Sequence, residues 1–240
     1  TGIDTRVCTA DAPYEVRRVS FEESDRSGRR GPELARDTMT GFVDVSDGKR
    51  GLAVFSRTVK EFRLAPDGSG SAVELSLLRA VDGKFPVDEH TFIDTGDPFA
   101  QCIGPQFFEF ALCPHDGDWR AARLPGRCAA YLNPLIAAEF GKGAGTGKLP
   151  LESAALFTLH KSALQFSGLK QAEKGKAWIL RLFNPGPEPV RERLSFFKKP
   201  RGVQEVRLDE KPLGRLEPEK DGSIKLEVGA GKIITLAARF

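Results

Sequence analysis

The chain has 240 residues, 40% of them hydrophobic and 29% charged, and its 36 Lys and Arg against 33 Asp and Glu leave a net charge of +3. This composition excludes wholesale disorder, collagen and coiled coil, and so small a net charge excludes a chain drawn as a whole onto nucleic acid or an anionic membrane. The 25 glycines and 16 prolines are scattered along the chain, which leaves few intervals for helices. An all-β fold with few or no helices is therefore predicted.

The first half of the chain predicts short strands separated by turns and polar loops. The strands are expected around residues 14–21 and over 42–45, 51–55, 73–78 and 106–112. The second and third of these flank Asp47-Gly48, a turn signal, and predict a β-hairpin. Exposed loops are expected at 24–36 and at 82–104.

From Pro114 to Pro150 the pattern weakens, and a long loop region is predicted. Loops of such length in a compact domain are more often functional, or packed on a partner surface, than idle. The glycine-rich stretch 141–147 lacks the spacing and the Ser or Thr of a phosphate-binding loop. We expect it to be a flexible surface loop.

The last part of the chain carries the clearest strand pattern, which predicts half of a β-sandwich. Its strands are expected over 177–183, 190–197, 203–208, 223–228 and 233–238. Composition and net charge both change near Ser162, because residues 163–240 hold 16 basic and 10 acidic residues, a net of +6. We therefore predict two domains, 1–162 and 163–240. The densest basic cluster, at 198–201, is expected to be solvated.

No pattern of metal ligands or of a catalytic nucleophile is present. The three histidines, His90, His115 and His160, are far apart, and none has another His or a Cys at ligand spacing. No G-x-S-x-G elbow occurs. The four cysteines form no C-x-x-C pair and no dense framework, which predicts reduced thiols in a cytoplasmic protein.

Two acidic pairs in the predicted loops, Asp116 with Asp118 and Asp94 with Asp97, are candidates for the two carboxylates of glycoside hydrolysis. Asp side chains commonly cap turns by bonding their own backbone, however, and that explanation suffices for each pair. Trp119 is a candidate for stacking on a sugar face, whereas Trp178 lies inside a predicted strand and is expected in the core.

Two segments resemble a known family. Residues 41–55 (GFVDVSDGKRGLAVF) resemble the V-D-V/L-S-D-G-x-x-G-x-A strand pair in the C-terminal part of family 38 α-mannosidases. Residues 108–119 (FEFALCPHDGDW) are similar to that family's F-x-x-A-L-x-P-H-x-G-D-W segment. Shorter similar segments follow the family's order at 74–79, 133–135, 163–164, 169–173 and 180–185. The resemblance covers nearly the whole chain from Ala12 to Phe240.

The resemblance implies the C-terminal, non-catalytic segment of a zinc-dependent, retaining α-mannosidase. In that family the zinc ligands, the aspartate nucleophile and the aspartate acid/base belong to an N-terminal α/β domain and the region just after it. We therefore expect no catalytic residue, metal ligand or cofactor in this chain, and zinc in the missing catalytic domain. The implied fold is an N-terminally truncated portion of a mutarotase-like supersandwich over 1–162, followed by a small β-sandwich over 163–240.

The resemblance also implies partners. These are the chain's own N-terminal catalytic domain and, through the parent enzyme, mannose-containing oligosaccharides; neither nucleic acid nor a membrane is expected, and a homo-oligomer stays open. His115, Asp118, Trp119 and Arg120 are expected either to line the sugar pocket or to brace the interface with the catalytic domain. The brace is favoured, because a loop ending in Trp more often packs than binds.

Two other classes stay open. One is a stand-alone β-sandwich protein that either binds carbohydrate or is a mutarotase-like epimerase. The epimerase would need an acid and a base that converge on its concave face. A structural module without a ligand predicts exposed apolar surface where a partner domain docks.

Overall fold

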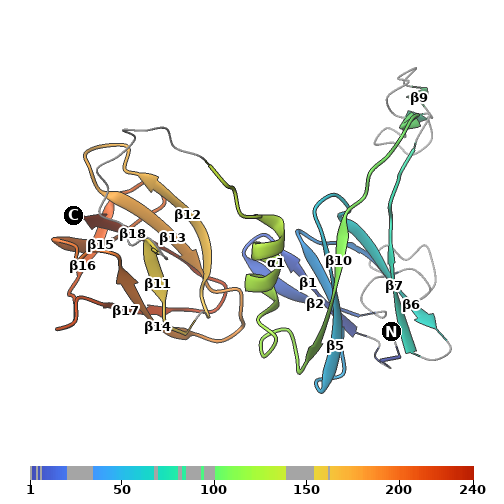
Figure 1. The fold of residues 1–240 in the computed structure, drawn as a ribbon, viewed down its shortest axis with the longest axis horizontal. Coiled ribbons are helices and arrows are strands. Elements are labelled where there is room, and N and C mark those ends of the chain that lie inside the picture. The colour runs from blue at the N-terminus through green and yellow to red at the C-terminus, as the bar shows by residue number, and fades with distance from the viewer. Residues whose placement is uncertain are drawn as a thin grey trace. The chain divides into compact units, whose positions relative to one another are not determined.

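The computed structural model describes residues 2–3, 5, 7–20, 35–67, 70–80, 83–84, 93–94, 101–138, 154–161 and 163–240. These residues form antiparallel strands and, within the described ranges, a single α-helix, α1 (Leu124–Leu132), so the all-β fold is confirmed (Figure 1). None of the described helical residues belongs to a span able to cross a membrane. The chain divides into two compact units, which we call unit 1 (residues 1–11 and 17–132) and unit 2 (residues 12–16 and 133–240).

Unit 1 contains a five-stranded sheet in the order β10-β5-β4-β1-β2 and a three-stranded sheet in the order β3-β6-β7 (Figure 1). The strands of the larger sheet are β1 (Val7–Ala12), β2 (Glu15–Ser20), β4 (Phe42–Ser46), β5 (Arg50–Ser56) and β10 (Phe110–Asp116). Those of the smaller sheet are β3 (Ala35–Thr38), β6 (Glu61–Asp67) and β7 (Gly70–Leu75). A separate two-residue pairing joins β8 (Gly83–Lys84) to β9 (Ile93–Asp94).

The core of unit 1 takes side chains from both sheets. Val43, Val45 and Val54 of the larger sheet are buried in one cluster with Phe62 and Leu64 of the smaller sheet. Because side chains alternate along a strand, the neighbours of these valines point to the opposite face, which α1 contacts through β4 and β5. Strand β4 is therefore buried on both faces, which accounts for its nearly continuous apolar run.

Unit 2 is a β-sandwich of a three-stranded sheet, β11-β14-β17, and a five-stranded sheet, β12-β13-β18-β15-β16. The strands of the smaller sheet are β11 (Phe157–Leu159), β14 (Val190–Phe196) and β17 (Ile224–Val228). Those of the larger sheet are β12 (Gln165–Gln171), β13 (Trp178–Phe183), β15 (Gly202–Val206), β16 (Pro212–Leu216) and β18 (Ile233–Arg239). A short N-terminal segment also belongs to this unit: the Val16 N–H donates to the Pro185 carbonyl at 3.3 Å.

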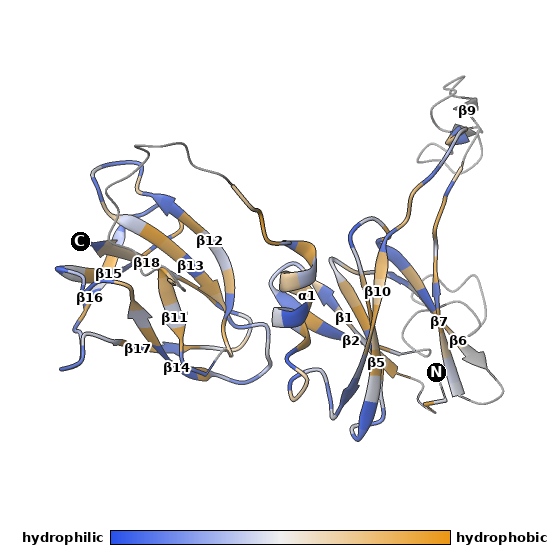
Figure 2. Cartoon of the chain, viewed as in Figure 1, coloured by the Kyte–Doolittle hydropathy of each residue, from blue (hydrophilic) through white to orange (hydrophobic). Residues whose placement is uncertain are grey.

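One apolar cluster fills unit 2. Leu180, Leu182 and Leu236 from the larger sheet meet Leu194 and Ile224 from the smaller one, and all five are fully buried. Hydrophobic residues are concentrated in strands such as β13, while the turns are hydrophilic (Figure 2). The strict alternation predicted for residues 223–228 is confirmed, because β17 buries every second residue.

The predicted hairpin at Asp47-Gly48 is confirmed by the pairing of β4 with β5. The predicted long loop at 114–150 is wrong in its first part, because residues 114–116 complete β10 and residues 124–132 form α1. Pro114 is accommodated because β10 is an edge strand, where a missing N–H on the open side costs no ladder bond. Helix α1 has Pro125 near its first position, where proline is tolerated.

Other predicted strands and loops begin at different residues or fall outside the described residues. The aromatic strand predicted over 106–112 begins only at Phe110. Strands β1, β3, β6, β11, β12 and β16 were not predicted, nor was the short pairing of β8 with β9. Of the loop expected at 24–36, residues 35–36 open β3 and the remainder lies outside the described residues, as does the glycine-rich stretch 141–147. The domain boundary at 162 stays a prediction; the two compact units divide between residues 132 and 133.

Candidate functional site

The two segments that carry the family resemblance lie side by side in unit 1. Strand β10 pairs with β5 along its whole length, from Phe110 opposite Ser56 to Asp116 opposite Arg50. Strand β4 pairs with the other edge of β5. The V-D-V-S-D-G hairpin and the P-H-D-G-D-W segment therefore form one three-stranded cluster, which places His115 next to residues about 70 positions earlier in the chain.

His115 forms a buried pair with Asp44. The His115 Nε2 atom lies 2.8 Å from Asp44 Oδ1, and each side chain is only 2% exposed. The Thr9 hydroxyl donates to Asp44 Oδ2 at 3.3 Å. Burial raises the pKa of Asp44, and the hydrogen bond from His115 opposes that rise only in part. The imidazole is therefore held inward by a carboxylate within the sheet.

Gly51 makes room for the imidazole. It lies directly opposite His115 in the β5–β10 ladder. A Cβ atom placed on Gly51 would stand 2.2 Å from His115 Cε1 and 2.4 Å from Nε2, which no unshifted side chain tolerates. The last glycine of the V-D-V-S-D-G-x-x-G pattern, Gly51, is therefore required because the His115 ring occupies the space of a side chain at that position.

The turns of the two segments are also joined. The Ser46 hydroxyl donates to the Gly117 carbonyl at 2.9 Å and accepts the Gly48 N–H at 3.0 Å. The Gly117 N–H donates to the Lys49 carbonyl at 2.8 Å. Both glycines have a positive φ, +83° at Gly48 and +71° at Gly117, which side chains other than glycine rarely adopt. The Asp-Gly steps of both segments are therefore parts of one interlocked pair of turns.

Asp118, Trp119 and Arg120 organise the turn that leads from β10 to α1. The Asp118 carboxylate accepts the N–H groups of Arg120 at 3.0 Å and Ala121 at 2.9 Å. Partial burial alone would raise the pKa of Asp118, but these N–H groups and the Arg120 guanidinium outweigh it and lower the pKa. The Trp119 side chain is buried, and the Arg120 guanidinium carbon lies 4.5 Å from its ring centroid. This is the arrangement of packed residues rather than of an open sugar-stacking platform.

A second, partly buried carboxylate, Asp11, fixes the start of β4. Its Oδ1 atom accepts the N–H groups of Gly41 and Phe42, each at 2.8 Å. Burial raises the pKa of Asp11, and the two backbone N–H groups offset part of that rise. Neither Asp11 nor Asp44 was singled out from the sequence. A lone Asp inside an apolar strand such as FVDVS is the signal that indicates a buried partner.

The cluster offers little chemistry beyond stabilisation. A shallow depression of about 460 Å³ beside His115 is lined by Arg50, Leu52 and Pro114 among others. His115 turns its Nε2 atom to Asp44 instead of to that depression. Across the described ranges, no three His, Cys, Asp or Glu side chains gather in a group that could hold a metal ion.

Comparisons with known proteins agree with this fold. Residues 163–236 match the family model of the "Glycosyl hydrolases family 38 C-terminal beta sandwich domain". A putative mannosylglycerate hydrolase of Halalkalibacterium halodurans is 29% identical over 150 residues, which are 62% of this chain and 15% of that protein. An α-mannosidase from Enterococcus faecalis aligns with 100% of this chain and 25% of its own, at 20% identity and a TM-score of 0.78. A glycosyl hydrolase family 38 protein from the same species aligns with 100% of this chain and with 26% of its own length, at 19% identity and a TM-score of 0.73.

The fold and these matches define a β-sandwich chain in which residues 163–236 match the C-terminal β-sandwich domain of glycoside hydrolase family 38. Over its whole length the chain has the fold of part of the two Enterococcus faecalis proteins. The resemblance found in the sequence is confirmed. The chain spans between 15% and 26% of the length of these relatives.

Proposed function

We propose that this chain is the non-catalytic C-terminal segment of a zinc-dependent, retaining α-mannosidase that hydrolyses terminal α-mannosides, and that the segment alone is inactive. The family match of residues 163–236 and the names of the relatives support the parent activity. The described residues do not fit a zinc site. Zinc, nucleophile and acid/base are accordingly assigned to the parent's N-terminal catalytic domain.

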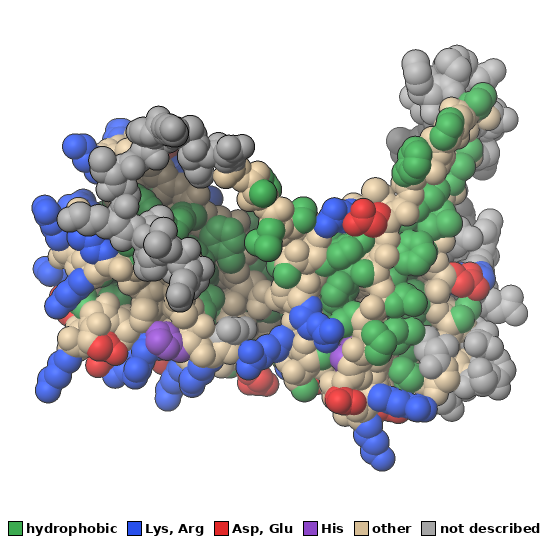
Figure 3. Space-filling view, in the orientation of Figure 1, with side chains coloured by type: hydrophobic (Ala, Val, Ile, Leu, Met, Phe, Trp, Pro, Cys, Tyr) green, Lys and Arg blue, Asp and Glu red, His purple; other side chains and the backbone are tan. Residues whose placement is uncertain are grey.

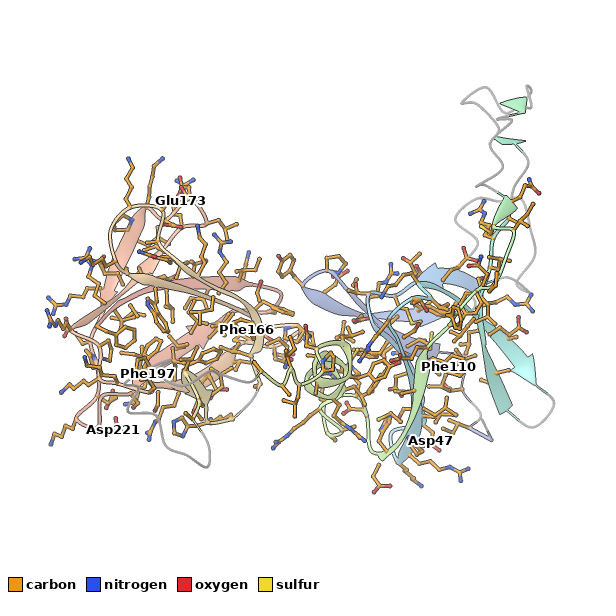
Figure 4. All side chains as sticks on the ribbon, turned by 45° about the horizontal axis from the view of Figure 1, so that its top comes forward. Asp47, Phe110, Phe166, Glu173, Phe197 and Asp221 are labelled. Carbon is orange, nitrogen blue, oxygen red and sulfur yellow. The ribbon has the colours of Figure 1, made fainter. Side chains whose placement is uncertain are left out.

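The observation that carries the proposal is an uncovered face of β10 in unit 1. Leu112 pairs with Val54, which pairs with Val43, so Leu112 lies on the sheet face that forms the core. Val43 and Val54 are buried, yet Leu112 is 62% exposed, and Phe110, two residues earlier on the same face, is 50% exposed (Figure 4). Figure 3 shows hydrophobic side chains in a band along β10. Water-exposed core-face residues of this size indicate a surface that another part of the protein covers.

We assign this face to docking against the catalytic domain, with His115, Asp118, Trp119 and Arg120 as a brace. The buried His115–Asp44 pair joins β10 to the middle of the sheet, so the exposed face stands on a fixed strand. Asp118 holds the turn after β10 in the same way. The face therefore presents a rigid apolar surface, which lowers the entropic cost of association.

The test uses the full chain with and without the separately expressed catalytic domain of the same protein. The chain alone should not hydrolyse an aryl α-mannoside or mannosylglycerate in the presence of zinc, and turnover would refute its inactivity. The two parts should form a stable complex. Leu112→Lys should abolish that complex, whereas Leu208→Lys, at a 59% exposed leucine of unit 2, should leave it intact. Sugar binding by the chain alone on a glycan array would instead favour a stand-alone carbohydrate-binding protein.

We further propose a cytoplasmic location. The four cysteines are free, and three of them are buried. Burial raises the pKa of Cys8 and of Cys128 to about 12, so both thiols stay protonated and unreactive. Thiols of this kind are typical of proteins in a reducing compartment. Secretion of the native protein into an oxidising compartment would contradict the proposal.

A further inference from the structure

The larger sheet of unit 2 carries a depression on the face turned away from the core. It has a volume of about 550 Å³ and lies between the turn before β13, the start of β15, strand β16 and the end of β18. Its lining includes five basic residues and no acidic one: Lys174, Lys176, Arg201, Arg215 and Arg239. Figure 3 shows Lys and Arg side chains gathered around this end of unit 2, near the C-terminus.

Small residues make the floor of the depression. Gly202 lies opposite Arg239 in the β15–β18 ladder, and Gln204 lies opposite both Ala237 and Arg215. A Cβ atom placed on Gly202 would meet no atom within 4 Å. Gly202 and Ala237 therefore leave open space between the longer side chains that line the depression.

The cations of the depression have few carboxylates to balance them. Arg215 pairs with Glu217 at 3.1 Å, and both side chains are well exposed. The other four basic residues form no ion pair with any described residue. The neighbouring carboxylate of Glu173 (Figure 4) is directed to Lys170, at 3.3 Å. Like charges held close together repel, and an anion bound among them would relieve that repulsion.

We propose that this depression binds a phosphate ester of a sugar. Arginine guanidinium groups match phosphate oxygens in paired hydrogen bonds, and Arg201, Arg215 and Arg239 line the depression beside or within three adjacent strands. The Gln204 side chain lines the same depression, and its amide suits the hydroxyl groups of a sugar ring. The volume lies in the usual range of small-molecule sites. The site is separate from the proposed docking face and does not depend on it.

The experiment measures binding of three probes to the full chain by calorimetry: a hexose 6-phosphate, the same hexose without phosphate, and inorganic phosphate. We expect the hexose phosphate to bind more tightly than either other probe. Replacing both Arg201 and Arg239 by Gln should weaken its binding roughly tenfold or more, because two charge-assisted hydrogen bonds are lost. Lys220→Gln with Lys232→Gln is the control, since it removes the same charge at exposed residues outside the depression.

A second variant changes the shape without changing the charge. Gly202→Val fills the floor of the depression at a position where no atom obstructs a side chain, so the fold should be retained and binding lost. Equal losses in the control pair would overturn the site, and so would unchanged binding in Gly202→Val. Inorganic phosphate binding as tightly as the hexose phosphate would overturn the assignment to a sugar ester.

Discussion

The two units of this chain hold two sheets together by similar means and differ at one edge strand. Unit 2 has one apolar cluster, closed by leucine and isoleucine side chains from both of its sheets. Unit 1 has an apolar cluster as well, and both units bury polar side chains, Asp44 and His115 in unit 1 and Asn184 and Glu192 in unit 2. Each unit also leaves an aromatic side chain of an edge strand exposed on its core face, Phe110 in β10 and Phe166 in β12. The units differ in that β10 exposes two such side chains in succession, Phe110 and Leu112, which form a larger surface for another part of the protein to cover.

The largest effect is expected when the units are separated. Residues 154–240 alone should unfold cooperatively, because they contain every residue of the apolar cluster that fills unit 2. Residues 1–138 alone should bind a hydrophobic dye and show little cooperativity, because apolar core-face side chains stay exposed. Dye fluorescence and thermal melting by circular dichroism measure both. Equal cooperativity and equal dye binding of the two fragments would break the comparison.

The next largest effect concerns the buried pair. His115→Ala leaves the buried Asp44 side chain without its main hydrogen-bond partner, and such a loss costs about 3 kcal/mol of unfolding free energy. The control is His160→Ala, at an exposed residue whose ring bonds the Ser195 hydroxyl at 2.9 Å; a surface change of this kind stays within about 0.5 kcal/mol. Urea unfolding measures both. A His115→Ala variant as stable as the control would show that the pair does not stabilise unit 1.

A steric test of the same pair follows. Gly51→Ala places a Cβ atom against the His115 ring and should cost about 2 kcal/mol. Gly214→Ala, where nothing lies within 4 Å, should be nearly neutral. Because the clash is with His115, adding Gly51→Ala to His115→Ala should cost much less than adding it to the wild-type chain. Additive losses in the double variant would place the cause outside the pair.

A smaller effect is expected at the turn after β10. Asp118→Ala removes the carboxylate that accepts two backbone N–H groups and should cost about 1 kcal/mol. Asp116→Ala is a suitable control, because Asp116 is exposed and its side chain forms no hydrogen bond or ion pair with the described residues. Thermal melts of both variants test the assignment, and equal losses would exclude a specific role for Asp118.

The smallest effect is a change in how steeply the free energy of unfolding depends on pH. Burial raises the pKa of Asp11 above 3.8, so the folded chain binds more protons than the unfolded chain between these two values. The stabilisation from this group is therefore present at low pH and lost as the pH rises through the folded pKa. Asp11→Asn keeps an oxygen that accepts both N–H groups and removes the titration, so its stability should fall less from about pH 4 to about pH 7.

The matched variant is at Asp47, whose contribution to stability depends on pH in the opposite direction. The N–H groups of Arg50 and Lys49 lower the pKa of Asp47, so its contribution is present above 3.8 and lost as the pH falls through the folded pKa. Asp47→Asn should therefore reduce the loss of stability in acid. Urea unfolding over a pH series distinguishes the two variants, and identical slopes for both would contradict the assigned shifts.

Much of the fold was predictable from the sequence because local signals and burial agree. The Asp47-Gly48 hairpin and the alternation of β17 were found for that reason. Helix α1 was missed because glycine and proline, at 125–126, stand in its first turn, and only the tertiary contacts of Leu124 and Cys128 show why it forms. The site was half predictable: His115 was named, but its partner Asp44 is revealed only by a strand register linking residues 71 positions apart.

Pro114 limits how a partner can bind along the open edge of β10. A strand added beside an open edge needs donor groups at regular intervals, and a proline in the middle of that edge interrupts them. A neighbour cannot extend this sheet past residue 114 by main-chain pairing. Phe110 and Leu112 project from a face of the sheet and not from its edge, so whatever shields them packs on their side chains and is selected by its shape.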